Sequence, residues 1–391
     1  MMFVPSREAA LARLAAFTPH MGRDYASLRN YDRPPHDHVS RLSPYLRHRM
    51  ISEDEVLRAA LAQHSPASAE KFIQEVYWRT YWKGWLEQRP SVWTNYRAAL
   101  NGALNNVQTQ AGLRREWEAA CSGATGIACF DAWAKELVET GYLHNHARMW
   151  FASIWIFTLR LPWELGADFF MRHLLDGDPA SNTLGWRWVA GVQTVGKTYL
   201  ARPDNIAKYT DGRFNPSGLA SFAAPLDTPP APDRTPVRLS DPLPPGKVGV
   251  LITEDDLTPD WMLDQLPSKP AAIAAINGTQ FRSPLAVAPQ VVDFVDAAIT
   301  DAKTRLGEMT PITSAEGIDA WAAHNGLDAI VMSYTPVGGT ADALRGLKTP
   351  LHQMVRPYDA RAWPYATAGF FKFKAKIPTL LKTYDDQLDL F

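Results

Sequence analysis

A proline-rich stretch near the middle of the chain divides the sequence into two parts with different patterns. Between Phe214 and Lys247 the chain carries nine prolines, at positions 216, 225, 229, 230, 232, 236, 242, 244 and 245. Proline lacks a backbone N–H and clashes with the preceding helical turn, so this stretch cannot continue a helix. Because 391 residues also exceed what one hydrophobic core usually supports, we expect two domains, over 1–216 and 247–391, joined by a linker over 217–246.

The part before the linker has helical periodicity almost throughout. Ser52 and Glu55 form a capping-box pattern at a helix start. The segment 131–140 is followed by Gly141, in the manner of a glycine C-cap. We expect irregular or short helical structure over 90–115. The first part is therefore predicted to be an all-α domain.

The part after the linker has a different period. Short apolar runs typical of buried strands occupy 248–252, 271–276 and 328–334, and helical patterns lie between them. This alternation predicts a parallel, Rossmann-like α/β sheet. The first run is not followed by GxGxxG, so a standard dinucleotide site is not supported. Gly338 and Gly339 follow the third run, where a small ligand could bind at the carboxyl edge of the sheet.

Charge and cysteine content narrow the functional classes. Residues 1–216 carry 25 Lys and Arg against 21 Asp and Glu, whereas 217–391 carry 15 against 20. This asymmetry is compatible with an anionic partner for the first part. Two cysteines do not make a disulfide framework, which favours a reducing compartment.

No segment indicates export or membrane insertion. The N-terminus has acidic residues and lacks the apolar core of a secretory signal. The longest apolar run, 149–158, is well short of the roughly 20 residues that span a bilayer. We therefore expect a cytoplasmic protein without membrane contact.

Polar residues interrupt the most apolar region, 141–191. They lie at or near the ends of its helical patterns: Asn145, Arg148, Asp176, Asp178 and Asn182. Ionisable groups in such places are costly to bury unless they are paired or bound to a ligand. A polar ligand inside the helical bundle is therefore expected.

Metal and nuclease chemistry have weaker support. The segment 176–178 could chelate Mg²⁺, but the sequence offers it neither further carboxylates nor a phosphate-substrate motif. The segment 36–38 is a loop, and the two histidines of 144–146 are two positions apart, so on a helix they do not face each other. We expect no metal site.

Several motifs resemble those of the photolyase/cryptochrome flavoproteins and follow that family's order. They are SRLSPYL (40–46), EVYWR (75–79), TGYLHNHARM (140–149), DGDPASN (176–182) and GWRW (185–188). The resemblance implies that 1–216 is the family's helical FAD-binding domain. Residues 247–377 resemble its α/β antenna domain more faintly. The family places that domain first, so a circular permutation is implied, and an antenna chromophore is possible.

The resemblance also implies which residues hold FAD without a covalent bond. They are Ser40, Leu42, Ser43, Phe72, Arg79, Asn145, Arg148, Asp176, Asp178 and Asn182. Hydroxyl groups such as those of Ser40 and Ser43 can donate to phosphate oxygens. Arg148 and Asp176 match an ion pair beside the isoalloxazine. Asn182 matches the position that faces the flavin N5, where an amide can accept from N5–H.

Further matches imply a lesion pocket and an electron relay. Glu75, Trp78, Met149 and Trp188 match positions around a flipped-out pyrimidine dimer, where indole stacking contributes roughly 1–3 kcal/mol per base. Trp163 and Trp186 match the tryptophan relay that leads to the flavin. The outermost member is not assigned, and Trp117 is one candidate. Any one of these tryptophans could instead be core packing.

The function implied is light-driven repair of cyclobutane pyrimidine dimers in UV-damaged DNA by a monomeric lyase, with Glu75, Trp78, Met149, Asn182 and Trp188 catalytic. One alternative is a cryptochrome-like blue-light receptor without repair activity. Another is a light-independent nucleic-acid-binding module. His146 stands where the family commonly has arginine, which weakens one expected DNA contact. Basic side chains that could compensate by binding phosphates are Arg41, Arg47, Arg49, Arg187 and Lys197.

Overall fold

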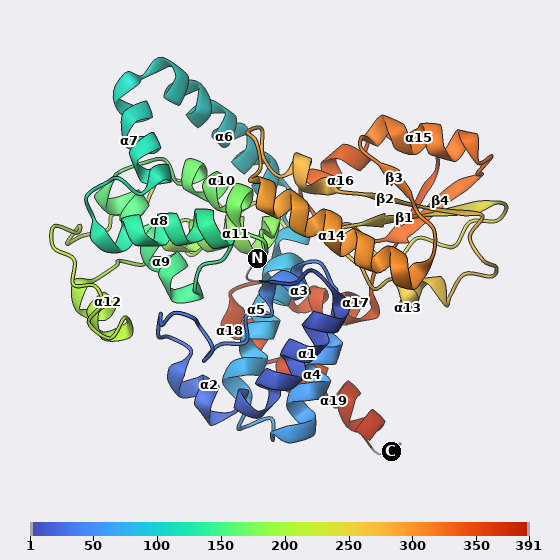
Figure 1. Cartoon of the computed structure of the whole chain (residues 1–391), viewed down its shortest axis with the longest axis horizontal. Coiled ribbons are helices and arrows are strands. Elements are labelled where there is room, and N and C mark those ends of the chain that lie inside the picture. The colour runs from blue at the N-terminus through green and yellow to red at the C-terminus, as the bar shows by residue number, and fades with distance from the viewer. Residues whose placement is uncertain (1–2, 389–391) are drawn as a thin grey trace.

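A computed structural model describes residues 3–388 and places a helical half beside an α/β half (Figure 1). The helical half precedes residue 210, and the sheet begins at residue 248. A helical region followed by a parallel α/β region is the fold class predicted from the sequence. Among residues 3–388, no helix has both the length and the apolar composition needed to cross a lipid bilayer.

The helical half consists of short and medium helices around a tryptophan-rich core. Its elements are α1 (Arg7–Phe17), η1 (Thr18–His20), α2 (Arg23–Leu28), α3 (Ser43–Arg47), α4 (Glu53–Gln63), α5 (Glu70–Glu87), α6 (Ser91–Thr109), α7 (Ala111–Ser122), α8 (Ala128–Thr140), α9 (Asn145–Ser153), the π-helical turn η2 (Ile154–Thr158), α10 (Trp163–His173), α11 (Pro179–Val189) and α12 (Pro203–Tyr209). Ser52 caps α4 with a complete capping box, and Gly141 ends α8 at a φ of 69°.

The prediction of irregular or short helical structure over 90–115 is wrong, because α6 is a continuous helix of 19 residues. Its buried residues include Tyr96, Leu100, Ala103 and Val107, which recur at three- and four-residue spacing. This stripe faces the core while the asparagines between its members face solvent. Tertiary packing therefore stabilises a helix that its composition does not suggest.

The α/β half is built on one parallel sheet. Its elements are β1 (Val248–Thr253), α13 (Asp260–Leu263), β2 (Ala272–Ile276), η3 (Gly278–Phe281), α14 (Pro289–Leu306), β3 (Thr310–Ile312), α15 (Ala315–His324), β4 (Ala329–Ser333), α16 (Gly339–Leu344) and β5 (Leu351–Met354). The strand order is β3-β2-β1-β4-β5, and all four pairings are parallel. The sequence patterns predict β1, β2 and β4. They miss β3 and β5, which are short and form the two edges of the sheet.

The two faces of the sheet belong to different hydrophobic clusters. On β1, Leu251 packs in a small cluster with Trp321 of α15. Its neighbours Val250 and Ile252 join the large core that contains Phe294 of α14 and continues into the helical half. Because successive strand residues point to opposite faces, α14 is the layer through which the sheet joins the helical core.

The ends of the α/β half return to the helical half. The linker passes along it, with Thr235 N–H donating to Gln88 O at 2.8 Å. After β5, the chain forms α17 (Pro357–Ala362), η4 (Trp363–Tyr365), α18 (Phe370–Lys374) and α19 (Ile377–Leu388). The first three of these pack against α5. Figure 1 shows α18 beside α5 and α19 near α4.

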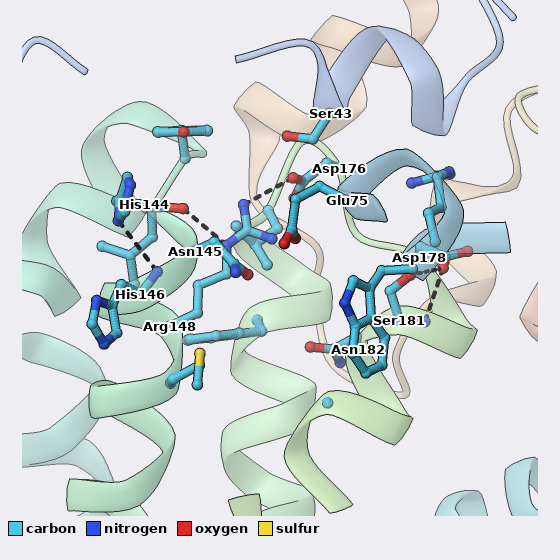
Figure 2. A pocket seen from close by; sticks show the side chains of 18 of the residues that line it. Ser43, Glu75, His144, Asn145, His146, Arg148, Asp176, Asp178, Ser181 and Asn182 are labelled. Atoms are coloured by element: carbon cyan, nitrogen blue, oxygen red, sulfur yellow. Dashed lines mark hydrogen bonds and ion pairs between the residues drawn. The ribbon is translucent and has the colours of Figure 1, made fainter. Parts of the chain in front are cut away.

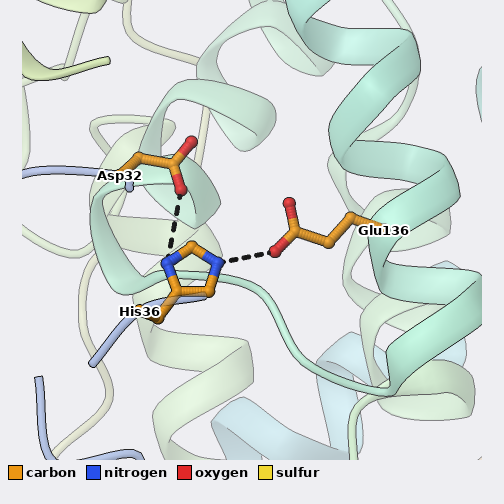
Figure 3. A group of neighbouring side chains, drawn as sticks. All are labelled: Asp32, His36 and Glu136. Atoms are coloured by element: carbon orange, nitrogen blue, oxygen red, sulfur yellow. Dashed lines mark hydrogen bonds and ion pairs between the residues drawn. The ribbon is translucent and has the colours of Figure 1, made fainter. Parts of the chain in front are cut away.

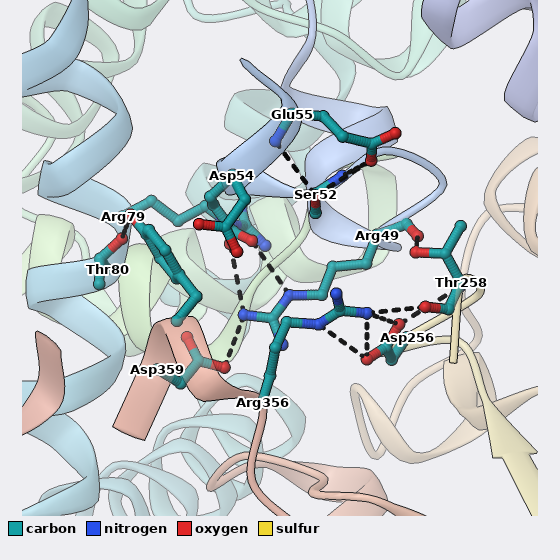
Figure 4. Close-up of polar contacts among 12 residues, drawn as sticks. Arg49, Ser52, Asp54, Glu55, Arg79, Thr80, Asp256, Thr258, Arg356 and Asp359 are labelled. Atoms are coloured by element: carbon teal, nitrogen blue, oxygen red, sulfur yellow. Dashed lines mark hydrogen bonds and ion pairs between the residues drawn. The ribbon is translucent and has the colours of Figure 1, made fainter. Parts of the chain in front are cut away.

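Buried ion pairs join the two halves where β1 ends (Figure 4). Two pairs link the halves, Arg47–Asp255 at 2.6 Å and Arg49–Asp359 at 2.6 Å. Next to them lies Arg356–Asp256 at 2.7 Å, a pair inside the α/β half. Arg47 and Arg49 have side chains only 4% exposed. The prediction that these two arginines could bind DNA phosphates is therefore wrong, because both are turned into the interface.

Glu87 makes a second buried contact between the halves. Its carboxylate accepts a hydrogen bond from the Tyr334 hydroxyl at 2.6 Å and one from the Val337 N–H at 2.7 Å. Burial disfavours the charged form and raises the pKa of Glu87 to about 7, although both hydrogen bonds oppose this shift.

The carboxyl edge of the sheet is packed against the helical half. A Cβ on Gly338 would lie 2.6 Å from Cγ of Pro179, and one on Gly339 would lie 2.0 Å from the Phe281 carbonyl oxygen. The glycines therefore permit close backbone approach. The cavity beside them measures only about 10 Å³, so the small-ligand site predicted at Gly338 and Gly339 is not present in this arrangement.

Candidate functional site

A cavity of about 540 Å³ lies inside the helical half and collects residues from distant parts of the sequence (Figure 2). Its lining includes almost all of the residues singled out from the sequence motifs. These are Ser40, Leu42, Ser43, Glu75, Trp78, Arg79, Asn145, Arg148, Met149, Asp176, Asp178, Asn182, Trp186 and Trp188. The fold thus brings α3, α5, α9 and α11 together around one space.

Two residues from the same set are placed elsewhere. Phe72 does not line the cavity; its ring packs against Tyr25 at 5.3 Å between centroids and is 3% exposed. Its predicted contact with a cofactor has no counterpart in this arrangement. Trp163 lies behind the cavity wall, with its ring 5.5 Å from that of Tyr96.

Arg148 and Asp176 form an ion pair in the cavity wall. Arg148 Nη2 lies 2.8 Å from Asp176 Oδ2, and Arg148 Nε donates to Leu143 O at 2.9 Å. Burial alone would raise the pKa of Asp176, but Arg148 and a hydrogen bond from Ser43 outweigh it, so this pKa is lowered. The pair is therefore charged at neutral pH.

The start of α11 presents a carboxylate and an amide to the cavity. Asp178 caps the helix, accepting from the Ser181 N–H at 2.9 Å. Burial opposes its charge, but neighbouring cations, foremost Arg79, lower its pKa to about 2. Asn182 Nδ2 donates to Ala167 O at 2.8 Å, and Oδ1 points into the cavity as an acceptor (Figure 2).

Several buried polar atoms of the lining lack a hydrogen-bond partner among the described residues. They are Nε and Nη2 of Arg79, Oδ1 of Asp176 and Nε1 of Trp186. Such atoms are costly and rare unless a ligand or water completes them. A guanidinium, a carboxylate and an amide acceptor beside apolar walls fit a polar, flat cofactor such as a flavin nucleotide.

Aromatic side chains form another part of the lining, referred to below as the aromatic wall. Trp78 stacks on Phe370 of α18, with centroids 3.5 Å apart and planes at 12°. Trp82 lies beside Trp78 at 5.2 Å, and Trp188 packs near Tyr199 at 5.6 Å. These partly exposed indoles offer flat surfaces for stacking.

Glu75 lines the cavity from α5, the helix that also carries Trp78, and pairs with Arg29. Burial raises the pKa of Glu75, and the positive charge of Arg29 opposes this shift. Sequence reasoning missed Arg29. It follows α2 in a polar loop, 46 positions from Glu75, and no spacing links the two.

His146 does not supply a cation to the cavity. Its Nδ1 lies 2.8 Å from the Asn30 carbonyl oxygen, and its ring stacks on Trp150 with centroids 4.0 Å apart. Burial lowers the pKa of His146, so the ring is neutral at pH 7. The expectation of a weakened DNA contact at this position stays a prediction.

A separate polar cluster lies behind the cavity (Figure 3). His36 sits between two carboxylates, with Nε2 2.9 Å from Glu136 Oε1 and Nδ1 3.7 Å from Asp32 Oδ1. These three residues could offer metal ligands. However, the imidazole turns a different nitrogen to each carboxylate, and Arg213 also pairs with Asp32. A shared metal would need the ring to turn away from one carboxylate, so the expectation of no metal site stays a prediction.

Comparison with known proteins assigns the region that holds the cavity. Residues 72–218 match the family model described as the FAD binding domain of DNA photolyase. A deoxyribodipyrimidine photo-lyase from Streptomyces griseus is 35% identical over 159 residues, which are 40% of this chain and 33% of that protein. One from a Synechococcus species is 33% identical over 201 residues, covering 48% and 39%. The matches thus span little more than a third of those relatives' own length.

A solved cryptochrome from Synechocystis aligns over 52% of this chain and 43% of its own, at 26% identity and a TM-score of 0.45. At that score the alignment adds nothing to the assignment of the fold.

Proposed function

This chain belongs to the photolyase/cryptochrome flavoprotein family, and we propose that it is a light-driven lyase that splits cyclobutane pyrimidine dimers in DNA. FAD is its cofactor. One observation carries the proposal: flavin-facing and lesion-facing residues line the same cavity. A pyrimidine dimer extruded from one DNA strand and a flavin would therefore meet without a protein wall between them.

The polar wall would hold the cofactor. Ser40 and Ser43 would donate to its phosphates, and the Arg148–Asp176 pair would orient the ring system. Asn182 Nδ2 donates to a backbone carbonyl, so its Oδ1 would be free to accept a hydrogen bond from the flavin N5–H. The bound flavin supplies one-electron chemistry driven by light, and the protein supplies binding and orientation.

The aromatic wall would hold the lesion. Trp78 and Trp188 offer ring faces, and Trp78 is fixed in place by its stack on Phe370. Glu75 can accept from pyrimidine N–H groups, while Arg29 keeps its carboxylate paired. Met149 fills the apolar side of the pocket.

We propose that the α/β half is the family's antenna domain and that a circular permutation of the whole chain placed it after the helical domain. The strand order β3-β2-β1-β4-β5 follows the first five strands of a Rossmann-like sheet. The close packing at Gly338 and Gly339 argues against an antenna pigment at that edge. We also propose a monomer acting on UV-damaged DNA.

A direct experiment uses the full chain loaded with FAD. The flavin is reduced, dimer-containing oligothymidine is added, and dimer loss is followed by absorbance under blue light and in the dark. We expect loss in the light only, and slower loss in Glu75→Gln. Binding of the oligonucleotide to the reduced protein without any dimer loss would contradict the proposal.

The second candidate is a cryptochrome-like receptor without repair activity. The neutral His146 favours it, since a family cation is missing at the pocket. A light-dependent spectral change of the flavin together with intact dimers would select this function.

A further inference from the structure

The segment 174–178, between α10 and α11, turns its side chains and its backbone to different sides. The carboxylates of Asp176 and Asp178 lie at the cavity (Figure 2). Three backbone carbonyls of the segment are instead contacted by side chains that do not line the cavity. The position of the two carboxylates therefore depends on what holds these carbonyls.

Two arginines donate to carbonyls of this segment. Arg282, which follows η3 in the α/β half, donates through Nη1 to Leu174 O at 3.1 Å. Arg47 donates through Nε to Gly177 O at 2.8 Å, and its Nη1 donates to Asp255 at 2.6 Å. The segment is thus fixed to the α/β half twice, directly by Arg282 and indirectly through Arg47.

His48 lies between the same two halves but makes a less certain bridge. Its Nε2 is 3.1 Å from Leu175 O, and its Nδ1 is 2.9 Å from Glu254 O. Burial, together with the charges of Arg47 and Arg282, lowers the pKa of His48 well below its usual value. A neutral imidazole has a single N–H, so it donates to only one of these carbonyls at a time. The two arginines therefore supply the hydrogen bonds that do not depend on a tautomer.

The backbone beside Arg282 is fixed by helices of the cavity half. Arg97 of α6 donates to the Arg282 carbonyl at 3.1 Å, and the Ser283 hydroxyl donates to Asp168 of α10 at 2.6 Å. Gly177 leaves room for the guanidinium, because a Cβ there would lie 3.0 Å from Arg282 Nη1. The side chain of Arg282 therefore reaches the segment from a fixed base.

Arg282 is unusually placed for a buried cation. It is 3% exposed, and its Nε and Nη2 have no hydrogen-bond partner among residues 3–388. Burial and the positive charge of Arg47 lower the pKa of Arg282 to about 10, so the side chain is charged at neutral pH. A buried guanidinium without a hydrogen-bonded carboxylate is costly, and an apolar side chain would avoid that cost. Stability alone therefore does not account for arginine at this position.

We propose that Arg282 is a positioning residue of the flavin site, through which the α/β half holds the segment 174–178 at the cavity. The inference rests on the proposed function, since FAD must occupy this cavity. Arg282 acts through the backbone that carries Asp176. Because the Arg148–Asp176 pair would orient the flavin, a segment free to shift would lose that geometry. By linkage, bound FAD stabilises the docked position of the α/β half in turn.

The first experiment measures FAD affinity of the full chain by fluorescence titration. In Arg282→Met we expect FAD to bind at least about tenfold more weakly. Arg282→Lys, which keeps a charged donor, should stay within about threefold of the parent. The matched control, Arg356→Met, removes a buried guanidinium of the same half whose hydrogen bonds go to Asp256 and Thr258, and it should stay within about twofold. Parental affinity in Arg282→Met, or an equal loss in Arg356→Met, overturns the proposal.

Hydrogen exchange of the FAD-free chain separates the possible failures. We expect the backbone amides of 174–182 to exchange faster in Arg282→Met than in the parent, and at the parental rate in Arg356→Met. Faster exchange together with parental FAD affinity would mean a purely structural contact and overturns the positioning role. Unchanged exchange in Arg282→Met overturns the hold on the segment. A parent chain that does not bind FAD overturns the proposed function itself, whatever the exchange rates are.

Discussion

The cavity of the helical half and the carboxyl edge of the sheet treat buried charge in opposite ways. In the cavity, Arg148 pairs with Asp176, but Nε and Nη2 of Arg79, Oδ1 of Asp176 and Nε1 of Trp186 lack hydrogen-bond partners among the described residues. At the sheet edge, Arg47, Arg49 and Arg356 each contact a carboxylate within 2.7 Å. The cavity measures about 540 Å³, against about 10 Å³ at the edge.

This difference separates ligand binding from assembly. The carboxyl edge of a parallel sheet is the usual ligand site of α/β proteins. Here its charges are used to dock the sheet on the helices, so little room remains for a ligand. The helical half instead keeps unpaired donors and acceptors around open space, as a cofactor site requires.

The largest effect is expected from breaking the interface. Arg49→Met would leave Glu53 and Asp359 buried without their shared cation, at a cost of about 3–5 kcal/mol in unfolding free energy. Urea denaturation measures this loss of unfolding free energy. Arg238→Met, which removes a half-exposed pair with Asp241, should cost under about 1 kcal/mol. Equal effects of the two variants would contradict the importance assigned to the interface.

The raised pKa of Glu87 predicts how the free energy of unfolding depends on pH. Its folded pKa of about 7 lies above the unfolded value of about 4.3, so the folded state binds the extra proton. Its contribution is fully present below about pH 4 and is lost as pH rises through 7, by at most about 4 kcal/mol. Stability curves of the parent and Glu87→Gln between pH 5 and 8 test this. We expect a flatter curve for the variant, and parallel curves would refute the shift.

A substitution at Arg148 tests the cavity separately from the interface. Arg148→Gln removes the partner of Asp176, and we expect FAD to bind roughly 10–100-fold more weakly, or about 1.4–2.7 kcal/mol. Arg202→Gln, in an exposed pair with Asp204, should not change FAD affinity. Fluorescence titration with FAD gives both values, and similar affinities for the two variants would place the cofactor elsewhere.

Gly338 tests whether the sheet edge is as tightly packed as described. Gly338→Ala would press a Cβ against Pro179, and such overpacking typically costs about 1–3 kcal/mol. Thermal unfolding of the FAD-free protein is the measurement. A neutral substitution would mean that the edge can open.

The smallest effect is expected at Gly185, which lines the cavity and has open space where a Cβ would stand. Gly185→Ala should stabilise the FAD-free protein by about 0.5–1 kcal/mol through helix propensity. Its added methyl group in the cavity lining should weaken FAD binding by less than tenfold. Gly102→Ala, on the exposed face of α6, has the same open surroundings and should give the stability gain alone. Unchanged FAD affinity in Gly185→Ala would mean that this part of α11 does not contact the flavin.

The residues of the cavity can be predicted from the sequence more completely than those of the interface. The residues of the cavity lie in short motifs whose order and spacing are visible, from Ser40 to Trp188. The interface pairs residues that no spacing connects, such as Arg47 with Asp255, 208 positions apart. Arginine at those positions therefore suggests a surface charge until the fold is known. The short strands β3 and β5 were missed because three or four residues give too little periodicity.

The position of α17 and α18 against α5 has a consequence for biosynthesis. While the chain emerges from the ribosome, α5 is complete long before residues 357–374 have been translated. Until then the apolar side of α5 that later receives Tyr358, Trp363 and Phe370 is uncovered. A nascent chain halted before residue 357 would thus expose apolar surface to which chaperones can bind. Complete folding of the helical half would then require residues 357–374.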